Sequence, residues 1–242
     1  MPVITLYTFS KVLPPKEIVR KLNKKRIKER WITAKVSKYN KNEVIISYWY
    51  YEDVEIGLKK VFSEEDALEI VSFLKQNGKT KVLKRTHCFI NVFTKTLEVY
   101  RGLDSKTEEI VNALEKFLGI KFSPIKIKAK DLKQIYSKHG TELKQAVFKN
   151  VEGLMYEILR GKNLENNKKF NEYLRKFPDC LRVISFRPRI RFLNSLSKYQ
   201  VTLNGDKGTL KFSSNGMFSF RPRFEIRQIV FIIAATLGLL PF

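Results

Sequence analysis

The net charge of this chain is the feature that most restricts how it can fold. Its 242 residues include 47 Lys and Arg against 24 Asp and Glu, a formal net charge of +23. Repulsion among so many like charges disfavours a compact state. However, 43% of the residues are hydrophobic and 12% are aromatic, which excludes a disordered chain. We therefore expect a folded protein with an acidic partner, nucleic acid first and an anionic membrane surface second.

The charge is distributed unevenly along the chain. Residues 1–62 and 121–178 each carry +8 and residues 179–242 carry +7, whereas residues 63–120 are neutral. Half of the arginines fall between Arg182 and Arg227. This distribution predicts one basic surface and one ordinary surface.

Other features narrow the class of protein. Two cysteines, Cys88 and Cys180, make no disulfide framework, which fits a reducing cytosol, so we expect a cytoplasmic protein. The N-terminal residues lack the layout of a signal peptide, and the most apolar stretch, 229–240, is too short to span a bilayer. High Lys with low Gln is compatible with a thermophilic source.

The first half of the chain alternates helix and strand signals. Ser63 and Asp104 or Ser105 are expected to cap helices that stop at Asn77-Gly78 and Gly119. The predicted elements are a strongly basic helix over 16–30, strands near 31–38, 43–51 and 54–62, a helix from 63, strands near 80–93 and 96–101, and a helix from 105.

The second half reads as helices followed by strands. Lys126, Lys128 and Lys130 alternate with apolar residues, as in a half-exposed strand. Asn204-Gly205 and Asn215-Gly216 are typical of two-residue hairpin turns. The predicted elements are two or three helices over 131–176, strands at 181–192, 198–203, 208–212 and 217–220, and a final helix over 224–239.

These elements predict an α+β fold of antiparallel sheets flanked by helices. Residues 92–120 and 211–239 show a similar strand–helix pattern at an offset of about 119 residues, half the chain. A duplicated unit gives this likeness, and so does any strand–turn–strand–helix segment. We divide the chain into an N-terminal half, 1–125, with the basic helix, and a C-terminal half, 126–242, with a helical segment, an antiparallel sheet and a final helix.

The element Ser-Phe-Arg-Pro-Arg occurs twice, at 185–189 and 219–223. In the first copy, period-two alternation places Arg187, Arg189 and Arg191 on one strand face, roughly 6.5–7 Å apart, close to the spacing of phosphates along a nucleic acid strand. In the second copy, Arg221 and Arg223 mark the corner where a strand ends and a helix begins. Residues 179–242 contain only three acidic side chains, so an ordinary salt-bridged surface is disfavoured.

A run of four aromatic residues, Tyr48-Trp49-Tyr50-Tyr51, follows the same alternation. Tyr48 and Tyr50 face one way, and Trp49 and Tyr51 face the other. One pair is expected in the core, while the other is available as a platform on which bases stack.

Signals for catalysis are sparse. His87-Cys88 lacks a second pair of ligands at zinc spacing, and no phosphate-binding loop motif occurs. Asp53, Glu55 and Asp179 are the carboxylates available to a divergent metal-dependent nuclease. We expect no enzyme activity, no cofactor and no metal site.

The stretch 209–220 and the helix after it resemble the hairpin and helix of TATA-binding proteins. The resemblance covers about 30 residues. It implies an antiparallel sheet flanked by helices, with DNA across the sheet. The intercalating phenylalanines of that family have no matching positions here.

The sequence thus predicts a non-catalytic protein that binds nucleic acid, DNA more than RNA, through phosphate contacts. The alternatives are an interaction subunit of a nucleoprotein complex, docking through Phe231, Ile232 and 239–242, or the divergent nuclease. The predicted nucleic-acid-binding residues are Arg187, Arg189, Arg191, Arg221, Arg223, Lys24, Lys25, Lys28, Lys126, Lys128 and Lys130.

Overall fold

A computed structural model describes residues 3–59, 62–189, 199–213 and 223–238. The first half contains β1 (Val3–Thr8), α1 (Pro15–Leu22), β2 (Lys25–Ile27), β3 (Arg30–Val36), β4 (Glu43–Asp53), α2 (Val54–Leu58), α3 (Glu64–Gln76), β5 (Lys81–Asn91), β6 (Thr96–Val99) and α4 (Ser105–Leu118). The second half contains β7 (Ser123–Pro124), α5 (Ala129–His139), β8 (Gly140–Val151), β9 (Leu154–Arg160), the 3-10 turn η1 (Leu164–Asn166), α6 (Lys168–Lys176), β10 (Leu181–Pro188), β11 (Gln200–Asn204), β12 (Thr209–Ser213) and α7 (Arg223–Thr236).

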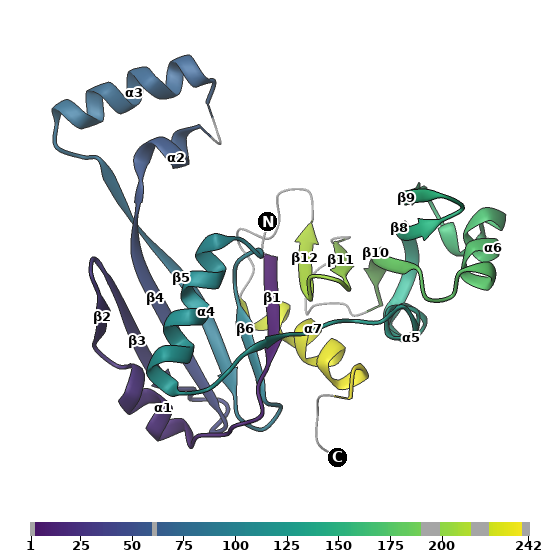
Figure 1. Ribbon diagram of the computed structural model, residues 1–242, viewed down its shortest axis with the longest axis horizontal. Coiled ribbons are helices and arrows are strands. Elements are labelled where there is room, and N and C mark those ends of the chain that lie inside the picture. The colour runs from purple at the N-terminus through teal and green to yellow at the C-terminus, as the bar shows by residue number, and fades with distance from the viewer. Residues whose placement is uncertain (1–2, 60–61, 190–198, 214–222, 239–242) are drawn as a thin grey trace.

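Within the described residues the strands form one antiparallel sheet. Its order is β2-β3-β4-β5-β6-β1-β12-β11-β10-β8-β9, with β7 paired to β1 off this path. Helices pack on the sheet, so the α+β fold class is confirmed. The sheet runs through both halves of the chain, with α1 and α4 near one end and α5 and α6 near the other (Figure 1).

The two halves carry their helices on opposite faces of the sheet. Ile4 and Leu6 of β1 belong to a core with α5, α6 and α7, whereas Tyr7 belongs to a core with α1 and α4. Because neighbouring residues of a strand point to opposite faces, these cores lie on either side of the same strand. The helices that pack on each half therefore leave the other face of its strands open, apart from the area that α7 covers, and the two open faces point in opposite directions. The division at residue 125 stays a prediction, since β1 contributes to both cores.

Local capping signals were read correctly from the sequence. The Ser63 hydroxyl accepts a hydrogen bond from the Asp66 backbone N–H (3.2 Å), and the Asp104 carboxylate accepts one from Thr107 N–H (2.9 Å). Gly119 ends α4 with a left-handed φ of 64°. These groups satisfy the otherwise unpaired backbone atoms at the helix ends.

The predicted basic helix over 16–30 is wrong beyond its first turns. α1 ends at Leu22, and the chain then forms a hairpin of β2 and β3. Lys24 and Lys28 adopt left-handed backbone conformations, with φ of 60° and 53°, that a helix does not allow. Ile18 and Leu22 are the buried positions of α1, and the charged stretch after them offers no apolar stripe to continue it.

Two further secondary-structure predictions are wrong. The segment 54–62 begins with α2 instead of a strand, and 131–176 contains the long β8–β9 hairpin between α5 and α6. Pairing of β8 with both β9 and β10 outweighs the helix-like spacing of its apolar residues. α2 and α3 project from the body at the tips of β4 and β5 (Figure 1).

The segment 125–128 between the halves is extended but is not a strand of the sheet. Ile125, Ile127 and Ala129 are buried, and the intervening Lys126, Lys128 and Lys130 are exposed, as the alternation predicted. Ile125 and Ile127 donate backbone hydrogen bonds to Leu6 and Gly205, so this segment runs directly over the β11–β12 turn. That turn spans 205–208 and is longer than the predicted two-residue turn.

The crossing predicts a strict need for glycine at position 208. A Cβ atom there would lie 2.2 Å from the Ile125 carbonyl oxygen, and φ is +57°. At Gly153 φ is also positive, but a Cβ would meet nothing within 4 Å. We expect Gly208→Ala to lower the free energy of unfolding by about 1–3 kcal/mol more than Gly153→Ala, measured by urea denaturation. Equal losses would show that the crossing tolerates a side chain.

Candidate nucleic-acid interface

The uncovered face of β2, β3, β4 and β5 carries a row of cationic and aromatic side chains. Arg26, Trp31, Trp49 and Arg85 are consecutive cross-strand partners on these four strands. Directly opposed residues of antiparallel strands share a face, so the row is Arg–Trp–Trp–Arg across the sheet. Both tryptophans are half-buried, and both arginines are exposed.

The rings in this row have defined geometry. The Trp31 and Trp49 rings stack with centroids 5.9 Å apart and planes at 9° to one another. Tyr51 lies beside them, with its centroid 6.2 Å from that of Trp31. The Arg85 guanidinium carbon is 5.0 Å from the Trp49 ring centroid, a cation–π arrangement. Trp49 Nε1 donates a hydrogen bond of 3.4 Å to Thr33 Oγ1.

The alternation of the aromatic run produces this face. Tyr48 and Tyr50 are buried in the core, 1% and 3% exposed, and Trp49 and Tyr51 lie on the opposite side of β4. The side-chain hydroxyl of Tyr48 donates to Glu109 on α4 at 2.9 Å, which holds the buried pair toward the helices. The prediction that one pair of the run is core is confirmed. Use of the other pair for stacking stays a prediction.

The predicted arginine ladder is only partly visible. Arg187 Nη1 lies 2.5 Å from Glu142 Oε2, and Arg189 Nε donates to the Gly140 carbonyl at 2.9 Å. β10 ends at Pro188, and its register against β8 shifts between Arg187 and Pro188. Regular alternation therefore stops before Arg189. Arg191 and Arg221 lie outside the described residues, and of Arg223 only its place at the start of α7 is described.

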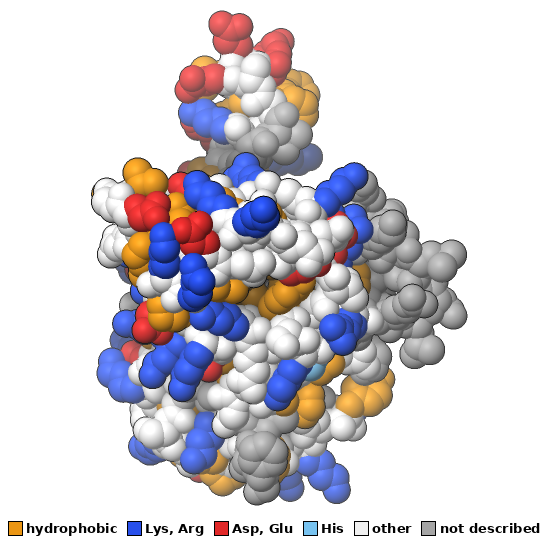
Figure 2. Space-filling model, turned by 90° about the vertical axis from the view of Figure 1, so that its right-hand side faces the viewer, with side chains coloured by type: hydrophobic (Ala, Val, Ile, Leu, Met, Phe, Trp, Pro, Cys, Tyr) orange, Lys and Arg blue, Asp and Glu red, His pale blue; other side chains and the backbone are white. Residues whose placement is uncertain are grey.

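The predicted lysines fall in two places. Lys24, Lys25 and Lys28 are exposed in and beside the β2–β3 hairpin, next to the row. Lys25 turns to the other face, where its Nζ lies 5.9 Å from the Phe117 ring centroid. Lys126, Lys128 and Lys130 are exposed on the segment between the halves. On the side of the molecule seen in Figure 2, Lys and Arg are spread widely over the body, and acidic side chains occur both on the α2–α3 projection and on the body.

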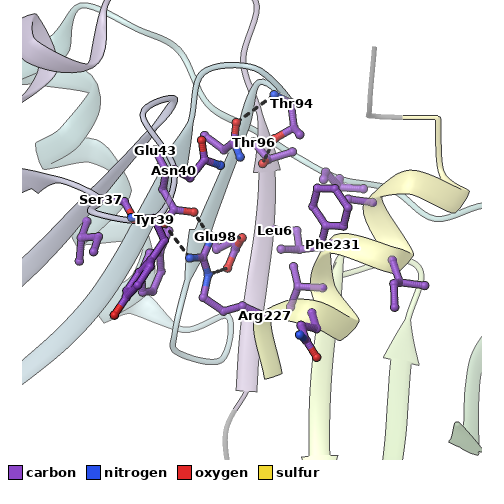
Figure 3. A pocket seen from close by; sticks show the side chains of 18 residues that line it. Leu6, Ser37, Tyr39, Asn40, Glu43, Thr94, Thr96, Glu98, Arg227 and Phe231 are labelled. Atoms are coloured by element: carbon purple, nitrogen blue, oxygen red, sulfur yellow. Dashed lines mark hydrogen bonds and ion pairs between the residues drawn. The ribbon is translucent and has the colours of Figure 1, made fainter. Parts of the chain in front are cut away.

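A second feature lies further along the same sheet face, where α7 crosses it. A cleft of about 610 Å³ separates α7 from β4, β5 and β6 (Figure 3). Leu6, Ile45 and Phe89 line it from the sheet, and Val230 and Phe231 line it from α7. Asn40 of the β3–β4 turn and Thr94 of the β5–β6 turn also line it, together with Asn91 and Thr96 at the adjoining strand ends.

A buried ion triad joins α7 to this face. Arg227 Nη1 donates to Glu43 Oε1 at 2.8 Å, and Arg227 Nε donates to Glu98 Oε2 at 3.2 Å. The guanidinium carbon also lies 4.0 Å from the Phe89 ring centroid. The Tyr100 hydroxyl donates a hydrogen bond of 3.2 Å to Glu98 Oε2. Burial raises the pKa of Glu98, and Arg227 and Tyr100 only partly offset this effect.

The described residues offer little for catalysis. No group of three His, Cys, Asp or Glu in this part of the chain lies close enough to hold a metal ion. His87 and Cys88 are neighbours on β5 and so point to opposite faces, with Cys88 buried in the core with α1 and α4. A hydrogen bond and the positive charge of Lys59 lower the pKa of Glu55, which ties this nuclease candidate into an ordinary surface pair.

Sequence reasoning missed Arg26, Trp31 and Arg85, as well as the triad. The sequence contained one signal that could have found Trp31: a hairpin turn centred on Asn40, between the two predicted strands, places Trp31 opposite Trp49. Comparison with models of known protein families and with curated proteins found no match to the chain. None of the helices described here is long and apolar enough to cross a membrane.

The triad predicts a large and pH-dependent effect of Arg227→Met. Two buried carboxylates lose their cation, so we expect a loss of about 3–5 kcal/mol in the free energy of unfolding at pH 7. Arg187→Met, which breaks a half-exposed pair, is the matched control and should cost about 1 kcal/mol or less.

The pH dependence follows from the carboxylates that Arg227→Met leaves behind. Burial raises the pKa of Glu98, and removing Arg227 takes away the cation that partly offsets this effect, so the folded variant binds a proton at Glu98 more readily than the unfolded chain does. The deficit relative to wild type should therefore shrink as the pH falls from 7 towards 4 in urea titrations. If the difference in unfolding free energy between the variant and the wild type does not change with pH, then the variant does not leave a buried carboxylate without a cation.

Proposed function

We propose that this protein binds nucleic acid without catalysing a reaction on it, and that the row Arg26–Trp31–Trp49–Arg85 contacts unpaired bases. The observation that carries the proposal is two stacked, half-exposed tryptophans held between two exposed arginines on a sheet face. Aromatic rings stack on bases of any sequence, and arginine binds phosphates or stacks on bases.

The electrostatics of the chain support the same proposal. A net charge of +23 favours a polyanionic ligand, and the β2–β3 hairpin beside the row adds Lys24 and Lys28. A purely structural role is the competing explanation for the tryptophans, since a cross-strand aromatic pair stabilises a sheet by about 0.2–1 kcal/mol. DNA is the first ligand to test, as the resemblance of residues 209–220 to TATA-binding proteins implies, with RNA as the competitor.

Substitution of the tryptophans separates these roles. We expect Trp49→Ala to weaken binding of a labelled 20-nucleotide single strand about 10-fold or more, because stacking contributes about 1–3 kcal/mol per base. Phe73→Ala removes an exposed aromatic side chain from α3, away from the row, and should leave the affinity unchanged. Fluorescence anisotropy at 0.15 M salt gives both affinities. Unchanged affinity in a folded Trp49→Ala protein would assign the pair to sheet stability alone.

The salt dependence identifies the phosphate contacts. In the wild type, log Kd should rise steeply with log salt, and Arg26→Ala with Arg85→Ala should reduce the slope by about 1.4 for a single strand. Arg175→Ala, on α6, is the control. Replacing Arg187, Arg189 and Arg191 together tests the face that the sequence predicted. A slope lowered by this triple variant and not by the Arg26 and Arg85 pair would move the interface to the C-terminal half.

An interaction subunit of a nucleoprotein complex is the second candidate, favoured by the α2–α3 projection. Ile56, Leu68 and Phe73 are exposed there beside an acidic first turn of α3. α7 was the helix expected to dock a partner. One face of α7 is buried through Ile226, Ile229 and Ile233, and among its residues with described side chains Phe231 is apolar and exposed. Residues 239–242 lie outside the described residues.

A further inference from the structure

The cleft under α7 lies on the same sheet face as the tryptophan row. Ile45 and Phe89 line the cleft, and Trp49 and Arg85 follow four residues away along β4 and β5. At about 3.3 Å per residue, these positions are roughly 13 Å apart along the strands. A single strand lying over the row therefore reaches the cleft within a few nucleotides.

The interior of the cleft presents hydrogen-bond acceptors between apolar walls. Glu43 and Glu98 lie in its lining, and each carboxylate oxygen has capacity beyond its bonds to Arg227. Thr94 and Thr96 also line the cleft and share a hydrogen bond of 2.6 Å. Phe89 and Phe231 provide aromatic wall surface. An anion is disfavoured here, because the lining holds two carboxylates and one guanidinium.

The rim of the cleft has the opposite character. Lys38 and Lys41 flank Tyr39 and Asn40 in the β3–β4 turn, and Lys95 lies between Thr94 and Thr96 in the β5–β6 turn, all three lysines being exposed. A ligand that fits must present planar ring faces to the apolar walls, donate hydrogen bonds inside and carry negative charge outside. A nucleotide whose base has an exocyclic amino group meets all of these requirements. Carboxylate side chains accept hydrogen bonds from the cytosine amino group in this way.

We propose that the cleft binds an unpaired base with an exocyclic amino group, as in cytosine, adenine or guanine, and disfavours uracil and thymine. This inference rests on the proposed function, since it names the bases that the neighbouring row delivers. Uracil and thymine present a carbonyl oxygen where cytosine presents its amino group, so Glu43 and Glu98 would face another acceptor. The volume of about 610 Å³ is ample for one nucleoside and lies within the usual range for small-molecule sites.

The experiment compares 12-nucleotide oligodeoxycytidine and oligodeoxythymidine at pH 7.5 and 0.15 M salt. We expect the wild type to bind oligodeoxycytidine about 10-fold more tightly. Phe231→Ala should reduce this ratio to near 1, and Phe93→Ala, at 53% exposure against 54% for Phe231, should leave it unchanged. Trp49→Ala should weaken both ligands and keep the ratio. A wild-type ratio near 1, or a ratio unaffected by Phe231→Ala, overturns the inference.

A second measurement separates the cleft from the row. Cytidine and uridine monophosphate are titrated by calorimetry against the wild type and Glu98→Gln, whose folding is checked by thermal unfolding. We expect cytidine monophosphate to bind at least 5-fold more tightly to the wild type, with the preference lost in the variant. If no oligonucleotide binds, the proposed function fails, and this titration still tests the cleft. Equal or absent binding of the two nucleotides overturns the inference.

Discussion

β1 is the strand on which the rest of the structure depends. It pairs with β6 on one side and with β12 and β7 on the other, and its side chains are buried in both directions. Ile4 and Leu6 enter the core with α7, and Tyr7 enters the core with α1 and α4. A single alternating strand thus joins two cores across one sheet. The opposite placement of the helices in the two halves follows from this arrangement.

The placement of the helices on opposite sheet faces in the two halves explains where α7 lies. The core that it completes is on the Ile4 and Leu6 side, which is also the uncovered side of β4, β5 and β6. α7 therefore covers part of the face that α1 and α4 leave open, and the remainder of that face carries the tryptophan row. Arg227 stabilises the crossing through Glu43 and Glu98, two carboxylates 55 residues apart in sequence. Since a buried charge without a partner is costly, the triad holds one position of α7 against the sheet.

The sequence was sufficient for features that depend on neighbouring residues. The caps at Ser63 and Asp104, the stop at Gly119 and the alternation of Tyr48 and Trp49 are all local, and all are confirmed. Features that depend on distant pairing were not predictable. β8 carries apolar residues at helix-like spacing and becomes a strand because β9 and β10 flank it. Arg85 lies opposite Trp49 because of the β4–β5 register, which is set across the α2–α3 insertion and which no local pattern encodes. Arg26 lies opposite Trp31 in the β2–β3 hairpin, within a stretch that the sequence favoured as helix.

The difference between local and distant determinants also affects which surface is the better candidate for the nucleic-acid interface. Half of the arginines of the sequence fall within residues 182–227. Among them, Arg187 pairs with Glu142, Arg189 binds a backbone carbonyl and Arg227 belongs to the triad. Clustering along the chain therefore does not leave these three side chains free, because the fold brings carboxylates or a backbone carbonyl to each of them. Arg26 and Arg85 are far apart in sequence and flank exposed aromatic rings. Charge beside a stacking surface is the combination that suits single-stranded nucleic acid. In this face the tryptophans come from β3 and β4, and the arginines come from β2 and β5.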